Sequence, residues 1–120
     1  VAMCLLSIAL ARHPVFHFVA AFNRDEDTTR GLSAPPAVDD KGVLCGIDGA
    51  SGGTWLGVNT RTGLFTAILN HDDGASEAVS APPSGSGERL SRGQLVRRVL
   101  EGGAAVDAVD EWRRYPGYNL

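Results

Sequence analysis

Apolar residues dominate two stretches near the start of the chain, residues 3–11 and 16–22. A half-solvated antiparallel sheet would alternate apolar and polar positions, whereas these stretches are apolar at almost every position. Residues 12–15 between them contain Pro14, which fixes one backbone angle and cannot donate a backbone hydrogen bond. We therefore predict a β-hairpin covered on both faces, as in a sheet packed between another sheet and helices.

Short apolar stretches downstream predict three further strands, separated by glycine-rich or polar turns. The predicted strands are residues 43–47, 54–59 and 64–70. Gly52-Gly53 precedes the second of them, and residues 60–63 form the turn that follows it. Residues 28–41, before the first of them, are predicted to be loop.

The clearest helix signal begins at Ser91, which has capping-box spacing to Gln94, so that each side chain can satisfy a backbone N–H of the first turn. Leu90 and Leu95 have the spacing of a hydrophobic staple. One apolar face follows, formed by Leu95, Val96, Val99 and Leu100. Gly102-Gly103 is predicted to end this helix, because glycine adopts the left-handed cap conformation readily. Arg97 and Arg98 are predicted to lie on its solvated side.

Three other segments complete the pattern. Residues 71–89, rich in Ala, Ser, Gly, Pro and Asp, are predicted to be a flexible loop. Residues 104–114 are predicted to be a second helix. Residues 115–120 read as a turn leading into a new strand, so we expect the domain to continue beyond them.

Composition is ordinary for a globular domain, with 43% hydrophobic and 21% charged residues. The net charge of −3 argues against a nucleic-acid partner, which usually requires a basic face. The two cysteines, Cys4 and Cys45, do not form a disulfide framework and favour a reducing compartment, so we expect a cytoplasmic protein. No apolar run is long enough for a transmembrane segment. Cys45 is expected to be a core residue.

No cofactor or metal is expected. His71-Asp72-Asp73 combines metal-ligating residue types, but three adjacent side chains do not converge easily on one ion.

Four landmarks stand in order along the chain: Met3-Cys4, Asn23-Arg24-Asp25-Glu26, Gly52-Gly53-Thr54-Trp55-Leu56-Gly57 and Ser91-Arg92-Gly93-Gln94-Leu95-Val96. Together they resemble the NRDE family, also called the Transport and Golgi organisation protein 2 family. Asn70 and Tyr118-Asn119-Leu120 also resemble family positions. The chain departs from the family pattern after the tetrapeptide, where an aromatic pair and Arg-Pro are usual.

The resemblance implies a fold and a domain. The fold is α+β, a four-layer αββα sandwich like that of N-terminal-nucleophile hydrolases. Residues 3–120 would be the N-terminal part of a single NRDE-type domain, and a C-terminal half would complete its sheets. Such hydrolases cleave amide-type bonds, so the implied substrate is an amide or thioester of a small or lipid-like molecule.

The resemblance also implies roles for individual residues. If Met3 is the true start and is removed, Cys4 becomes the first residue, and its own α-amine can take the thiol proton. Arg24 would stabilise the thiolate, and Asp25 would hold the α-amine or a polar group of the substrate.

Amide side chains and an aromatic ring would complete the site. Asn70, as a further catalytic residue, or Asn23 would donate to an oxyanion. Asn23, Trp55 and Asn119 would bind substrate.

Other interpretations stay open. Cys4 in an apolar strand is also typical of a plain core residue, and the Asn23–Glu26 cluster is also typical of a turn with a surface ion pair. The main alternative function is a non-enzymatic carrier on the same fold, because the family is linked with lipid homeostasis, haem trafficking and Golgi organisation. A third is an interaction module with an inert Cys4.

Overall fold

The computed structural model describes residues 4–26, 29, 31, 33–70, 91–102 and the backbone of 118–119. Within them the chain is a mixed α+β protein with antiparallel sheets and one helix. The chain divides into two units, Val1–Arg30 and Gly31–Leu120, and each is described by itself. The predicted loop at 71–89, the predicted helix at 104–114 and the staple residue Leu90 lie outside the described residues.

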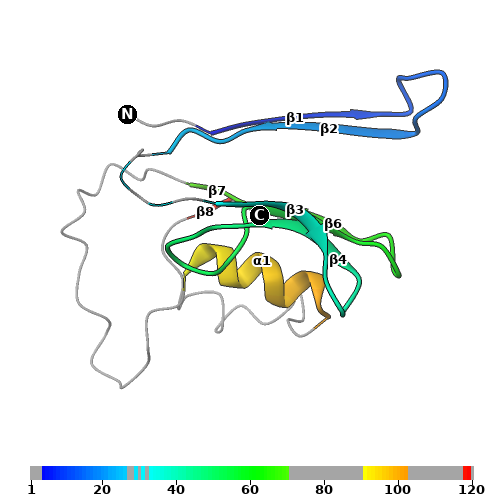
Figure 1. Ribbon diagram of the computed structural model, residues 1–120. Helices are drawn as coiled ribbons and strands as arrows, with labels where there is room; N and C mark the ends of the chain where they lie inside the picture. The colour runs from blue at the N-terminus through cyan, green and yellow to red at the C-terminus, as the bar shows by residue number, and fades with distance from the viewer. Residues whose placement is uncertain are drawn as a thin grey trace. The chain divides into compact units, whose positions relative to one another are not determined.

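The first unit is the predicted hairpin (Figure 1), but most of its strand residues are exposed and not covered on both faces as predicted. Strand β1 (Leu5–Leu10) pairs antiparallel with β2 (Phe18–Asn23), from Leu5 opposite Asn23 to Leu10 opposite Phe18. The backbone turns at Ala11, whose φ of 52° is left-handed, and its N–H donates to the carbonyl of His17 at 2.6 Å. The loop of residues 11–17 is thus longer than the predicted turn.

The second unit contains a four-stranded antiparallel sheet in the order β3-β4-β5-β6. Its strands are β3 (Ala34–Val38), β4 (Val43–Ile47), β5 (Leu56–Asn59) and β6 (Phe65–Ala67). A separate pair joins β7 (Leu69–Asn70) to β8 (Tyr118–Asn119). Strand β4 has the predicted bounds, and β8 confirms the strand expected near the end of the chain.

The prediction of loop across residues 28–41 was wrong, because β3 lies inside it. Two prolines, Pro35 and Pro36, removed the sequence signal for a strand. β3 is an edge strand, where missing backbone donors are tolerated, and its register with β4 is irregular between Ala34 and Ala37. The predicted strand at 64–70 is interrupted at Ile68, whose N–H donates to the carbonyl of Trp55.

Helix α1 (Arg92–Leu100) covers one face of this sheet (Figure 1). Ser91 and Gln94 form the predicted capping box, and Gly102 follows the helix with a φ of 77°. The core consists of apolar side chains from one face of the helix, from β4 and from Ile68. These are Val43, Cys45, Ile68, Leu95, Val96, Val99 and Leu100. The predicted helix, its apolar face and the buried state of Cys45 are therefore confirmed.

Two glycines bring the start of α1 against the turn before β5. Asp48 shapes this turn, accepting hydrogen bonds from the N–H groups of Ala50 and Ser51 at 3.0 and 2.8 Å. A Cβ on Gly53 would lie 2.4 Å from the backbone of Gly93, and one on Gly93 would lie 2.9 Å from that of Thr54. The Thr54 N–H donates to the Gly93 carbonyl at 3.1 Å. Only glycine fits this backbone contact, which joins two of the four sequence landmarks.

No helix among the described residues has the length and apolar character needed to span a membrane.

Candidate functional site

The hairpin places Cys4 beside the Asn-Arg-Asp-Glu tetrapeptide. Leu5 and Asn23 are the last residue pair of β1 and β2, so Cys4 and Arg24 continue the two strands side by side. The half-buried Cys4 thiol donates to the backbone carbonyl of Asp25, with 3.8 Å between sulfur and oxygen. A thiol is a weak hydrogen-bond donor, so this contact orients the Cys4 sulfur but contributes little binding energy.

The other charged residues of the tetrapeptide meet each other. A guanidinium nitrogen of Arg24 lies 2.7 Å from a carboxylate oxygen of Glu26. Both side chains are at the surface, so this ion pair contributes little to the free energy of unfolding. It does orient the Arg24 guanidinium toward Glu26. Asn23 and Asp25 are exposed.

The remaining predicted site residues belong to the second unit. Asn70 ends β7 and is exposed, and it pairs in register with Tyr118. Asn119 is the neighbouring residue on β8 and pairs with Leu69, so the two predicted asparagines stand on paired strands. Trp55 is half-buried, and its indole ring lies over Gly46, where a Cβ would be only 3.0 Å from the ring.

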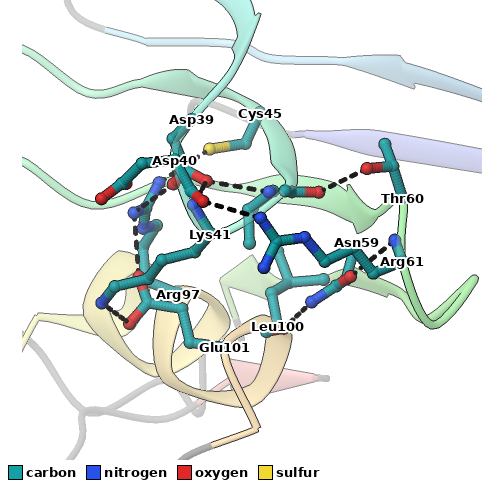
Figure 2. A network of polar contacts seen from close by, with 12 residues as sticks. Asp39, Asp40, Lys41, Cys45, Asn59, Thr60, Arg61, Arg97, Leu100 and Glu101 are labelled. Atoms are coloured by element: carbon teal, nitrogen blue, oxygen red, sulfur yellow. Dashed lines mark hydrogen bonds and ion pairs between the residues drawn. The ribbon is translucent and has the colours of Figure 1, made fainter.

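A polar cluster that the sequence did not reveal surrounds Arg97 (Figure 2). One guanidinium nitrogen donates to the sulfur of Cys45 at 3.2 Å. The other donates to a carboxylate oxygen of Asp39 at 2.7 Å and of Glu101 at 2.9 Å. Lys41 donates to the second oxygen of Glu101 at 2.6 Å. The prediction that Arg97 is simply solvated was therefore wrong.

The pKa values of this cluster shift in the directions expected for ion pairs. The Val43 N–H, helped by Arg97 and opposed by desolvation, holds the pKa of Asp39 below its usual value. Lys41 and Arg97, against desolvation, lower the pKa of Glu101, and Glu101 raises that of Lys41. Desolvation works to lower the pKa of Arg97, but hydrogen bonds to Cys45 and Asp39 outweigh it and raise the value.

The cluster fastens the β3–β4 turn to α1. Asp39 also accepts hydrogen bonds from the N–H groups of Lys41 and Val43, so one carboxylate shapes the turn and binds the helix. The sequence held one local signal, the helical i,i+4 spacing of Arg97 and Glu101. Asp39 and Cys45 lie 58 and 52 positions from Arg97, a separation that no local pattern bridges.

Asn59 fastens the β5–β6 turn to the same helix. Its buried side-chain amide donates to the carbonyl of Leu100 at 2.8 Å, and its oxygen accepts from the N–H groups of Arg61 and Thr62 (Figure 2). The carbonyl at the end of α1 and two turn donors are satisfied together. Both clusters therefore support the scaffold, and among the described residues no group of His, Cys, Asp or Glu is arranged to hold a metal.

Comparison with protein families gives a match over nearly the whole chain. The model of the family described as Transport and Golgi organisation 2 matches residues 3–120. No curated protein and no solved structure matches the chain. The matched range contains every candidate site residue named above.

Proposed function

Because the chain belongs to the Transport and Golgi organisation 2 family, we propose that it is a cysteine hydrolase of the N-terminal-nucleophile type. Its substrate would be an amide or thioester of a small or lipid-like molecule. The observation that carries this proposal is the position of Cys4, whose half-buried thiol lies beside the Asn23–Glu26 segment at the open end of the hairpin. A nucleophile needs this combination of partial access and nearby polar groups.

The chemistry would begin with Cys4 as the first residue of the mature chain. Its α-amine takes the thiol proton, and the sulfur attacks the carbonyl carbon of the substrate. The amine or thiol leaving group takes that proton from the α-ammonium as its bond to the carbonyl carbon breaks. Water then hydrolyses the acyl-thioester and regenerates the thiol.

The other predicted site residues would serve these steps. Arg24, oriented by Glu26, would favour the thiolate, and Asp25 would hold the α-ammonium. Asn70 or Asn23 would donate to the oxyanion, and Asn23, Trp55 and Asn119 would bind substrate.

We place this site in a four-layer αββα domain. The face of the β3–β6 sheet opposite α1 carries a continuous row of apolar side chains in direct register, Val38, Leu44, Val58 and Phe65. Val38 and Leu44 in this row are exposed. An apolar row across all four strands supports a further β layer on that face.

Two measurements test the hydrolase proposal. Intact-mass spectrometry of the protein from its native source should give a mass that begins at Cys4. Iodoacetamide should then alkylate Cys4 quickly at neutral pH, and Cys4→Ser should abolish this reaction. Cys45→Ser is the matched control, because Cys45 is buried and its loss should leave the fast reaction intact. A native chain that retains residues before Cys4 would lack the α-amine base and exclude the mechanism.

A binding protein on the same fold is the second candidate, and one observation favours it. The partner of the Cys4 thiol is a backbone carbonyl, not a base, and the adjacent strand exposes Leu5 and Ile8. Such a surface suits a lipid-like or haem ligand as well as a substrate. A carrier would retain its ligand after Cys4→Ser, whereas the hydrolase would lose turnover. In either case, free cysteines are compatible with a cytoplasmic location.

A further inference from the structure

The loop at the closed end of the β1–β2 hairpin exposes large apolar side chains. Val15 is 77% exposed and Phe16 is 60% exposed. Leu10 and Phe18, the strand residues on either side of the loop, are 61% and 41% exposed. Exposed apolar residues gathered at one loop, rather than scattered singly, are typical of an interaction surface.

The same loop carries a positive charge that no nearby carboxylate along the sequence offsets. Its cation is the exposed Arg12, and residues 4–24 include no aspartate or glutamate. The nearest carboxylates along the sequence, Asp25 and Glu26, stand at the opposite end of the hairpin, beyond the pair of Leu5 and Asn23. The loop therefore combines an apolar tip with positive charge, although the whole chain is acidic.

The loop is also held in shape by its own contacts. The Nδ1 atom of His13 accepts hydrogen bonds from the backbone N–H groups of Val15 and Phe16 at 3.2 and 3.1 Å. The rings of His13 and Phe16 lie 5.1 Å apart between centroids. The bond from Ala11 to His17 closes the base of the loop. A braced loop loses little conformational entropy when it binds.

From these observations we propose that residues 11–17 dock this protein on an anionic lipid surface. Val15 and Phe16 enter the boundary between headgroups and acyl chains, while Arg12 stays at the level of the phosphates. Charge complementarity selects this occupant: a basic, apolar tip gains both from acyl chains and from anionic headgroups. A neutral apolar partner would offer Arg12 no anionic group to contact. The docking is independent of the chemistry proposed for Cys4.

The second unit offers an internal comparison. The β5–β6 turn also has an arginine beside an exposed apolar residue, because Arg61 precedes Leu64, which is 43% exposed. Its arginine, however, is engaged within the fold, where it donates to the carbonyl of Asp40 at 2.9 Å. Leu64→Ser is therefore a matched control for Phe16→Ser, since each removes one exposed apolar side chain next to a hairpin turn.

The test is sedimentation of the full-length protein with vesicles of phosphatidylcholine, with and without phosphatidylserine. Binding should require phosphatidylserine and should weaken as salt is added. Phe16→Ser should lower the partition coefficient about tenfold, and Arg12→Gln about fivefold at low salt. Leu64→Ser and Cys4→Ser should bind like the unaltered protein. Vesicles should also shift the tryptophan emission of Phe16→Trp to the blue, and not that of Leu64→Trp.

Three outcomes would overturn the proposal. One is failure of the unaltered protein to sediment with anionic vesicles. Another is equal loss of binding in Phe16→Ser and Leu64→Ser, which would mean that the loop has no special part. The third is a large fall in melting temperature for Phe16→Ser with no effect of Arg12→Gln on vesicle binding, which would mean that the tip packs against protein instead.

Discussion

Arg97 on α1 donates a hydrogen bond to the sulfur of Cys45 on β4 at 3.2 Å, although the two residues are 52 positions apart. The same guanidinium binds Asp39 and Glu101, so one side chain ties the helix to the sheet and to the β3–β4 turn. Arginine suits this position because its planar group presents several donors in a fixed geometry.

Arg97→Lys should lower the free energy of unfolding by about 1–2 kcal/mol, because an ammonium cannot reach all three acceptors together. Denaturant unfolding measures the loss. A double-mutant cycle with Asp39→Asn should then show coupling between the two residues, since each loses the same ion pair. Additive effects of the two substitutions would mean that the ion pair of Arg97 and Asp39 contributes nothing to stability.

Gly53→Ala should destabilise the protein by about 3 kcal/mol, because its methyl group would collide with the backbone of Gly93. Gly93→Ala should act in the same direction through Thr54. Thermal unfolding followed by circular dichroism measures both. Gly63→Ala is the contrast: its φ of 74° is left-handed, unlike that of Gly53 or Gly93, but the space around it is open, so it should cost only about 1 kcal/mol. Equal effects at all three positions would contradict the close contact.

Acid should weaken the second unit through Asp39 and Glu101. Their pKa values in the folded protein are lowered from ordinary values of 3.8 and 4.5, so the unfolded state binds more protons as pH falls. The stabilisation is complete above about pH 5 and is lost progressively below it as pH approaches the lowered folded values. Urea unfolding across this range should show a smaller pH slope for Asp39→Asn with Glu101→Gln. An unchanged slope would mean that neither carboxylate is coupled to folding.

The reactivity of Cys4 should depend on the ion pair next to it. Glu26→Gln removes the carboxylate that lies 2.7 Å from the Arg24 guanidinium and leaves less compensated positive charge on the residue that follows β2, opposite Cys4. Alkylation of Cys4 should then become about two- to fivefold faster, and Arg24→Gln should make it slower by a similar factor. The rate is read from peptide masses at increasing times, with Cys45 as the internal reference. Identical rates in all three proteins would remove Arg24 from the proposed site.

The sequence by itself determined the parts of this protein that depend on neighbouring residues. Apolar runs on both sides of Pro14 predicted the first hairpin, and Ser91 with Gln94 predicted the start of α1. Hydrogen bonds and rotamer preferences within a few residues decide such elements, so local patterns suffice. The same pattern placed Cys4 beside the tetrapeptide, because a hairpin joins the ends of its two strands.

Only the tertiary structure decided the contacts between distant segments. No local preference favours strand β3. It forms because it pairs with β4 at the edge of the sheet, where Pro35 and Pro36 are tolerated. Its local sequence predicts that Arg97 is a surface residue, but in the folded chain its guanidinium contacts Asp39 and Cys45. Glycine lowers the intrinsic stability of a helix, so Gly93 in α1 is unfavourable when the helix is considered alone. The backbone of Thr54, which approaches closely at this position, accounts for the glycine. In each case the free energy comes from a partner far along the chain, which a local pattern cannot contain.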